Sequence, residues 1–186
     1  MKNTEKKPMD QVWQCLRSEE GPDLKLFRTR FDWMRNPRNG HEEKMVVLEG
    51  ADAVQVVAES DEAQILLVRQ YRFGIGAYIY ELPGGLIDEG ETPAEAASRE
   101  LREETGFASD DWKPMGRQAA NPVFMDAYVY HFAARGLSRV GEQLLDPSEA
   151  VTMEWVDREE VKKWLLAGQF QHPHTVCALM AYFSAC

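Results

Sequence analysis

The sequence predicts an α/β fold in which helices pack on a mixed β-sheet as an α/β/α sandwich, with an antiparallel β extension at the N-terminus. Two observations support this fold class. Strand-like patterns dominate the first half of the chain, and the helical patterns further along are separated by more strands. Helices that alternate with antiparallel strands favour a mixed sandwich over a doubly wound parallel sheet.

Composition and charge narrow the class of protein. Of the 186 residues, 44% are hydrophobic and 28% are charged, which is typical of a globular domain. The net charge of −10 argues against binding nucleic acid, because phosphate neutralisation needs a basic surface. No apolar segment has membrane-spanning length and none resembles a signal peptide, so we expect a cytoplasmic protein without a membrane partner.

The N-terminal third predicts strands separated by turns. Residues 1–20 are polar and punctuated, and we expect the start of the chain to be loosely held. The stretch LKLFRTRFDWM at 24–34 alternates like an extended strand, and NPRNG at 36–40 has the composition of a turn. The apolar runs MVVLEG at 45–50 and AVQVVAES at 53–60 predict two further strands.

The centre of the chain predicts a hairpin region and then a helix. ILLVRQYR at 65–72 follows a tight turn, and we expect the consecutive strands here to form a β-meander. A short strand in YIYELPGG ends at Pro83. TPAE at 92–95 predicts a helix start with a capping box and a proline at the first helical position, and Gly106 predicts its end.

The C-terminal part predicts two strands and two helices around a polar loop, LSRVGEQLLDPSEA. The expected strands are AYVYHFAARG at 127–136 and VTMEWV at 151–156. The expected helices are DREEVKKWLLAG at 157–168 and TVCALMAYF at 175–183. Together with the central helix, these segments complete the sandwich.

Three acidic residues, Glu100, Glu103 and Glu104, lie within one turn of the central helix. Like charges at i, i+4 cost only a few tenths of a kcal/mol per pair, so a solvated acidic face is one explanation. The other is a cation site, because the helix directly follows a glycine-rich loop whose backbone groups are free to meet a ligand. Two carboxylates and a loop carbonyl form the hard oxygen site that magnesium prefers.

The stretch GGLIDEGETPAEAASRELREETGF at 84–107 resembles the signature of the Nudix hydrolases. That signature is a glycine, five residues, a glutamate, seven residues, and then Arg-Glu-apolar-any-Glu-Glu-any-Gly-apolar. It is matched without departure by Gly85, Glu91, Arg99, Glu100, Leu101, Glu103, Glu104, Gly106 and Phe107. The resemblance implies a Nudix fold, dependence on Mg²⁺ or Mn²⁺, and hydrolysis of a nucleoside diphosphate linked to another group.

The resemblance also implies roles for the metal ligands. Glu100 and Glu104 would be the main ligands, joined by the backbone carbonyl of Gly84. Glu103 would share in metal binding or orient the attacking water. These four residues are the candidate metal site.

Arg99 would pair with Glu91 to hold the loop against the helix, although an ordinary surface salt bridge is the alternative.

The same family branch generally places a catalytic glutamate in the late polar loop, where Glu142 and Glu149 are the candidates. We favour Glu149, because it directly precedes the strand VTMEWV that can anchor it, and Glu103 is the alternative base.

Two further segments resemble the ADP-ribose and ADP-sugar pyrophosphatase branch. The first is VRQYR at 68–72 followed by ELPGG at 81–85, which begins with Glu81. The second is NPVFMDAY, which contains Pro122. The resemblance implies that ADP-ribose is hydrolysed to AMP and ribose 5-phosphate.

The segment before residue 50 resembles the extra strands through which enzymes of this branch dimerise. We therefore expect residues 1–45 to form a dimerisation element and residues 46–186 to form the hydrolase domain. A homodimer is the expected assembly.

Candidate substrate-binding residues lie in two places. Arg69 and Arg72 flank the strand that feeds the catalytic loop, and arginine suits bidentate phosphate contact. The N-terminal strands gather further cations and aromatic side chains, including Arg28, Arg35, Phe31 and Trp33. In this family branch the N-terminal strands help to build the adenine pocket, so Trp33 or Phe31 could stack on the base. The alternative is that these aromatic side chains pack in the core or in a dimer interface.

Two functional alternatives stay open. One is a Nudix hydrolase that acts on GDP-mannose or another nucleoside diphosphate derivative. The other is a nucleotide-binding sensor without turnover. His172 and His174, in the sequence QHPHT, are interpreted as structural residues of a loop and not as metal ligands.

Overall fold

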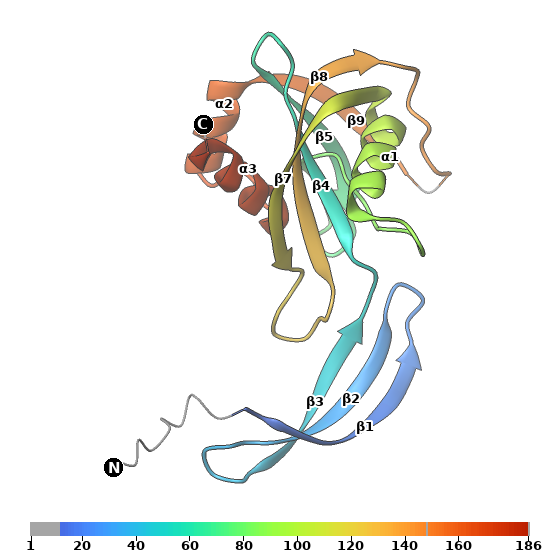
Figure 1. Cartoon of the computed structure of the whole chain (residues 1–186), viewed down its shortest axis with the longest axis vertical. Coiled ribbons are helices and arrows are strands. Elements are labelled where there is room, and N and C mark those ends of the chain that lie inside the picture. Colours follow the sequence, from blue (N-terminus) through green and yellow to red (C-terminus); the bar gives the residue numbers. More distant parts are fainter. Residues whose placement is uncertain (1–11, 148, 186) are drawn as a thin grey trace. The chain divides into compact units, whose positions relative to one another are not determined.

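A computed structural model describes residues 12–147 and 149–185 of the chain (Figure 1). The chain divides into two compact units. The first comprises the residues up to Gly50 together with Asn121–Ala127, and the second comprises Ala51–Ala120 and the residues from Tyr128 onward. Among the described residues, no helix is long and apolar enough to span a membrane.

The first unit is a three-stranded antiparallel sheet in the order β1-β2-β3. Its strands are β1 (Gln14–Asp23), β2 (Arg28–Arg35) and β3 (Glu42–Glu49). The loop Asn121–Ala127 is attached to β3, where the backbone N–H of Leu48 donates to the carbonyl of Phe124 over 2.7 Å.

Two N-terminal predictions need correction. A strand, β1, begins at Gln14 where the sequence suggested a loosely held segment; its side chains are polar on both faces, so no alternation reveals it. The strand predicted from residue 24 begins at Arg28, because Leu24 bonds to the carbonyl of Phe27 in the turn between β1 and β2. Residues 1–11 lie outside the described part of the chain.

The predicted end of the extension, residue 45, lies within β3. The division into residues 1–45 and 46–186 with separate roles stays a prediction.

The second unit contains two three-stranded sheets and three helices (Figure 1). One sheet has the order β4-β8-β7, with strands Ala53–Ala58, Tyr128–Arg139 and Phe107–Ala119. The other has the order β6-β5-β9, with strands Ala77–Glu81, Gln64–Arg72 and Thr152–Asp157. The helices are α1 (Pro93–Thr105), α2 (Arg158–Leu166) and α3 (Pro173–Ser184).

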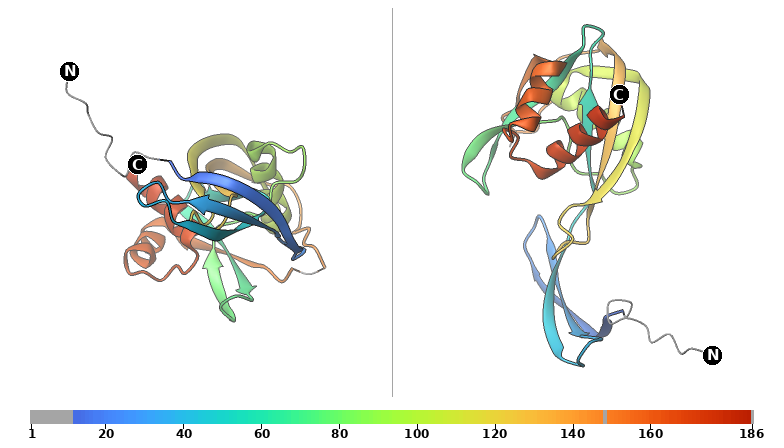
Figure 2. Two further views of the ribbon diagram at one scale, coloured as in Figure 1. Left: turned by 90° about the horizontal axis from the view of Figure 1, so that it is seen from below. Right: turned by 90° about the vertical axis from the view of Figure 1, so that its left-hand side faces the viewer.

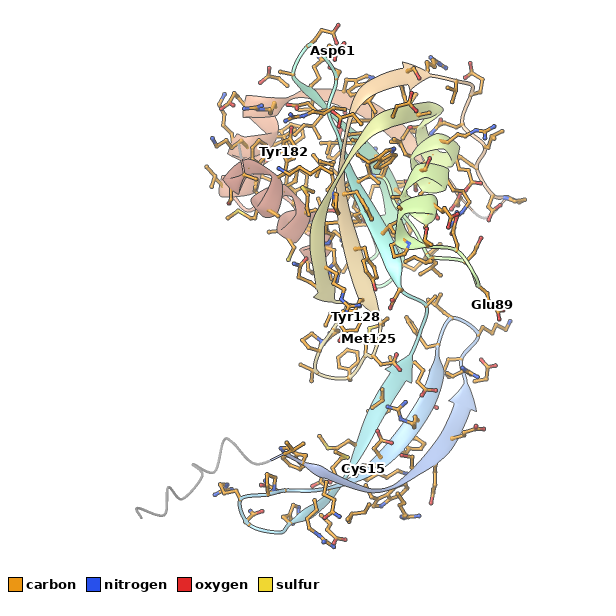
Figure 3. The ribbon with its side chains drawn as sticks, viewed as in Figure 1. Cys15, Asp61, Glu89, Met125, Tyr128 and Tyr182 are labelled. Carbon is orange, nitrogen blue, oxygen red and sulfur yellow. The ribbon has the colours of Figure 1, made fainter. Side chains whose placement is uncertain are left out.

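Helices cover the strands from two sides, with α1 on one side and α2 and α3 on the other (Figures 1 and 2). Strand β5 contributes to both cores in alternation: Ile65 and Leu67 pack in the cluster under α2 and α3, whereas Leu66 packs with Leu101 of α1. Tyr182 of α3 points toward the strands, where its hydroxyl donates to the buried carboxylate of Glu59 (Figure 3). The α/β/α sandwich is confirmed.

The predicted β-meander is correct for β2 and β3, which pair antiparallel, and wrong for the two strands that follow. Strand β4 pairs in parallel with β8, and β5 pairs with β6 and β9. Both β4 and the first half of β5 are buried on both faces, so their apolar runs carry no information about which strand lies beside them. The sequence analysis also missed β7, an edge strand with polar residues and Pro114, which an edge tolerates.

Candidate active site

Local sequence signals determine both ends of helix α1. The hydroxyl of Thr92 accepts from the backbone N–H of Glu95, whose carboxylate accepts from the N–H of Thr92 over 2.8 Å. This is the predicted capping box. At the other end Gly106 has φ of 74°, a left-handed conformation that favours glycine. Its backbone N–H donates to the backbone carbonyl of Arg102 over 2.8 Å.

The loop before α1 lies along the first residues of β4. The N–H groups of Val54 and Val56 donate to the carbonyls of Gly85 and Pro83, both over 2.9 Å. A Cβ added at Gly84 would overlap the backbone of Val54, and one added at Gly85 would overlap the carboxylate of Glu100. The two glycines therefore allow the backbone to pass between β4 and the acidic side chains of the helix.

Arg99 connects this loop to the helix. Its guanidinium donates to both carboxylate oxygens of Glu91, at 3.0 and 2.9 Å, and to the carbonyl of Leu86 at 2.8 Å. It also donates to Glu100 at 2.8 Å and to Glu103 at 3.1 Å. The hydrogen bonds from Arg99 lower the pKa of Glu91, while Glu91 and the other carboxylates raise the pKa of Arg99. The expected pair of Arg99 and Glu91 is present.

Glu104 is the most buried carboxylate of α1, with 3% of its surface exposed. Burial raises its pKa to about 8, and the negative charges of Glu100 and Glu149 add to this effect. The N–H of Gly84, which donates to Glu104 over 2.8 Å, and the charge of Arg72 partly offset it. Negative charge at this position is therefore costly, and a nearby cation would stabilise it.

The donor set fits a divalent hard cation. Glu100 is also largely buried, and its pKa is raised by burial even though Arg99 favours the charged form. Glu100 lies against Gly85 and Glu104 accepts from the N–H of Gly84, so both carboxylates lie beside the backbone of the loop, and carboxylate oxygens are ligands that such a cation prefers. Within residues 12–147 and 149–185, no three acidic, His or Cys side chains form a complete ligand group, so further ligands would be backbone oxygens, water or substrate.

The late loop is attached to the last turn of α1. Its backbone N–H groups at Val140 and Leu144 donate to the carbonyls of Gly106 and Glu103, over 2.9 and 2.8 Å. The side chain of Gln143 donates to the carbonyl of Glu104 over 2.6 Å. Gln143 was not predicted as a site residue, because a glutamine in a polar loop gives no signal of a contact with a distant helix.

The two candidate bases in this loop have different surroundings. The carboxylate of Glu149 accepts from the N–H of Asp146 over 3.0 Å, and its charge raises the pKa of both Glu100 and Glu104. The carboxylate of Glu142 pairs with Arg139 over 2.9 Å, and 86% of its side chain is exposed. Both residues are exposed, and the difference between them is that the charge of Glu149 acts on the helix carboxylates, whereas Glu142 is paired with Arg139.

A cavity of about 540 Å³ lies next to Glu149. Its lining includes Arg72 and His172, together with apolar side chains from the β5–β6 hairpin such as Tyr71 and Phe73. Arg72 forms two hydrogen bonds of 2.6 Å with Glu81, whose side chain is fully buried. This pairing raises the pKa of Arg72 and fixes the direction of its guanidinium.

The remaining candidates of the second unit and of the first unit have other contacts. Arg69 is exposed, and its guanidinium lies 5.0 Å from the ring centre of Tyr78. In the first unit, Arg35 pairs with Glu42 over 2.8 Å, and Arg28 is exposed at the start of β2.

The aromatic candidates of the first unit contact cations. The guanidinium of Arg17 lies 3.5 Å from the ring centre of Trp33, and the ammonium of Lys44 lies 3.9 Å from that of Phe31. A base that stacked on the same ring face would displace these cations. Pro122 is exposed in the loop Asn121–Ala127.

Known proteins are similar to this chain in sequence and in fold. The model of the NUDIX domain matches residues 49–179. An ADP-ribose pyrophosphatase of Mycobacterium tuberculosis is 35% identical over 158 residues, which are 84% of this chain and 76% of the relative. One of Bacillus subtilis is 32% identical, and the methanol dehydrogenase activator of Bacillus methanolicus is 31% identical, each over 142 residues covering 76% of this chain and 77% of the relative. The crystal structure of an ADP compounds hydrolase has the same fold, with a TM-score of 0.83 over 94% of both chains at 24% identity.

Proposed function

The chain belongs to the NUDIX family of hydrolases, and we propose that it hydrolyses the diphosphate bond of a nucleoside diphosphate sugar with Mg²⁺ as cofactor. ADP-ribose is the substrate that we propose, with AMP and ribose 5-phosphate as products. Mn²⁺ is expected to replace Mg²⁺. The observation that carries the proposal is the position of Glu149, which lines the same cavity as Arg72 and whose charge acts on Glu100 and Glu104.

The ligand residues support the metal part of this proposal. Glu100 and Glu104 would hold the ion together with the carbonyl of Gly84, and Glu103 would share in metal binding or orient the attacking water. When bound, the ion would polarise the phosphoryl oxygens and lower the pKa of the attacking water. Arg99 contributes by fixing two of these carboxylates through hydrogen bonds.

The other residues bind substrate and move the proton. Arg72 would donate to oxygens of the diphosphate, a role that suits the planar guanidinium. Glu149 would accept a proton from the attacking water as the new P–O bond forms and the bridging P–O bond breaks. Glu103 is the alternative acceptor. Arg69 and Glu81 complete the candidate set of this region, Glu81 through its bonds to Arg72.

The first unit supports a homodimer. Among its described strands only Thr29 is buried, and apolar side chains such as Met45 and Val46 are exposed on β3. A three-stranded sheet without its own core is marginally stable, so a second copy of the chain would stabilise it. We propose that Arg28, Trp33, Arg35 and Pro122 serve the nucleotide in such a dimer.

Two other functions are distinguishable from this one. A hydrolase of the same family that acts on GDP-mannose or another nucleoside diphosphate derivative is the second candidate. A sensor without turnover would bind the nucleotide and release no product.

The test is a substrate panel. The purified protein would be incubated with Mg²⁺ and ADP-ribose, ADP-glucose, GDP-mannose, UDP-glucose or diadenosine polyphosphates, with EDTA as the metal control, and released phosphomonoesters would be measured. We expect ADP-ribose to give the highest kcat/KM. Preference for another compound would overturn the substrate proposal, and binding without turnover of any of them would overturn the enzymatic proposal.

A further inference from the structure

The segment QHPHT forms the start of helix α3 and has no role in the reaction described above. His172 is the N-cap residue, and its Nδ1 accepts from the backbone N–H of Thr175 over 3.4 Å. The same Nδ1 lies 3.4 Å from the side-chain nitrogen of Gln55 in β4. Because Nδ1 faces two donors, the proton of the neutral ring is on Nε2.

A buried polar group anchors this arrangement. Thr175 and Gln55 are both buried, and the hydroxyl of Thr175 lies within 3.4 Å of the side-chain oxygen of Gln55. The same hydroxyl accepts from the backbone N–H of Leu82, the residue after Glu81, over 3.4 Å. The start of α3 is therefore tied to β4 and to the end of β6.

The opposite side of the His172 ring faces Glu81. Nε2 lies 3.9 Å from the same Glu81 oxygen that accepts from Arg72 over 2.6 Å. This distance is longer than a direct hydrogen bond, so the ring acts on the carboxylate through its N–H dipole and by occupying the adjacent space. Arg72 and His172 both line the cavity that contains Glu149.

We infer that His172 is a positioning residue that acts through Glu81 to hold the Arg72 guanidinium toward a diphosphate bound in the cavity. The inference rests on the proposed function, in which Arg72 binds the diphosphate. Without the ring, the Glu81 carboxylate gains room to rotate, and the direction of the guanidinium follows it.

The charge state of His172 fits this role. Burial lowers its pKa, and the charges of Arg72 and His174 lower it further, whereas Glu81 raises it. The ring is therefore neutral near pH 7 and does not compete with Arg72 for the charge of Glu81.

The variant His172→Asn tests the inference, because asparagine keeps a capping acceptor and removes the Nε2–H group. His174→Asn is the matched control: it lies in the same motif, but its Nε2 bonds to the carbonyl of Ala120 over 3.1 Å. Two measurements apply to each variant, the kinetics with ADP-ribose and Mg²⁺, and the calorimetric Kd for inorganic pyrophosphate. Thermal unfolding would be recorded in parallel.

We expect His172→Asn to raise both KM and the Kd for pyrophosphate about 10-fold, with kcat changed less than about 2-fold, and His174→Asn to match the wild type. In a Glu81→Gln or Arg72→Lys background, His172→Asn should add little, because the path through Glu81 is already broken. If His172→Asn only made the protein fold poorly, its effect on KM and Kd would persist in both backgrounds.

Wild-type KM and Kd values in His172→Asn would overturn the inference. An undiminished effect of His172→Asn in both backgrounds would also overturn it, because the residue would then contact the ligand directly or have a general structural role. Wild-type protein that binds pyrophosphate but hydrolyses no nucleotide sugar would overturn only the proposed function, since the Kd comparison still decides the role of His172. Wild-type protein that neither binds pyrophosphate nor hydrolyses a nucleotide sugar would overturn both.

Discussion

Charged side chains of the loop and helix at residues 84–106 are more buried than the pair Arg35 and Glu42 in the sheet of β1, β2 and β3. Arg99 and its partners Glu91 and Glu100 expose only 27%, 15% and 12% of their side chains, and they share one network. The pair Arg35 and Glu42 in the sheet exposes 46% and 51%. Exposed pairs contribute about 0–1 kcal/mol each, so the pair of Arg35 and Glu42 adds little to the stability of the sheet, whereas the hydrogen bonds of Arg99 order the carboxylates of the helix.

The largest expected effect is on the proposed base next to the helix. Glu149→Gln should lower kcat by about 10²–10⁴-fold, because the glutamine cannot accept the proton of the attacking water. Glu142→Gln is the matched control from the same loop and should keep kcat near wild type. Steady-state kinetics with ADP-ribose over a range of pH would check both variants. Equal losses in the two variants, or none in Glu149→Gln, would remove Glu149 as the base.

A methyl group added at the glycine pair should displace a carboxylate of the helix and change little in the rest of the fold. In Gly85→Ala the added Cβ would overlap the Glu100 carboxylate, which must then leave its place beside the loop. We expect kcat/KM to fall about 10²-fold, because a ligand group displaced by about 1 Å costs this much. Gly90→Ala, at a loop position where a Cβ meets no atom, controls for the chemical change itself, although its φ of 85° adds backbone strain. If Gly85→Ala kept full activity, the close approach would have no catalytic importance.

The stability of the metal-free protein should depend on pH through Glu104. Its folded pKa of about 8 lies above the ordinary value of 4.5, so the folded state binds the proton more tightly than the unfolded state. This contribution to the free energy of unfolding is fully present below about pH 4.5 and is lost as the pH rises toward 8.

Urea unfolding in EDTA at pH 5 and at pH 8 would measure this loss. Glu104→Gln should show a smaller difference between the two pH values than the wild type, and added Mg²⁺ should restore wild-type stability at pH 8. An identical pH dependence in the variant would contradict the assignment.

The smallest expected effect is in the sheet. Arg35→Ala should change the free energy of unfolding by less than about 1 kcal/mol, because the pair with Glu42 is exposed. Chemical denaturation would check this value, and size-exclusion chromatography would show whether the assembly changes. A rise in KM for ADP-ribose without loss of stability would support the proposed role of Arg35 at the nucleotide. A loss of several kcal/mol would mean that the sheet is held together by its surface pairs.

The same comparison explains what the sequence could predict. Helix α1 was predicted at both ends, because a capping box and a C-terminal glycine act over a few residues. Strands β1 and β7 were missed, because polar edge strands have no alternating pattern and form through their partners. The pairing of β4 with β8 was not predictable, since a strand buried on both faces gives no preference for a neighbour.

The candidate site divides in the same way. The carboxylates of α1 and their arginine follow from one short motif. Gln143 was not recognised and His172 was interpreted as a structural loop residue, because their partners Glu104 and Glu81 are distant in sequence and only the folded chain brings them close. Their residue types alone, a glutamine in a polar loop and a histidine before a proline, fit many structural roles.

Metal binding by the helix carboxylates tests the central claim most directly. Calorimetric titration with Mn²⁺ at pH 7, in two buffers of different ionisation enthalpy, would measure both the Kd and the protons released. We predict that binding releases a proton from Glu104, whose pKa in the metal-free protein is about 8, and that affinity falls at least about 10-fold in Glu104→Gln but not in Glu142→Gln. Equal affinity in Glu104→Gln and the wild type, without proton release in either, would contradict the claim.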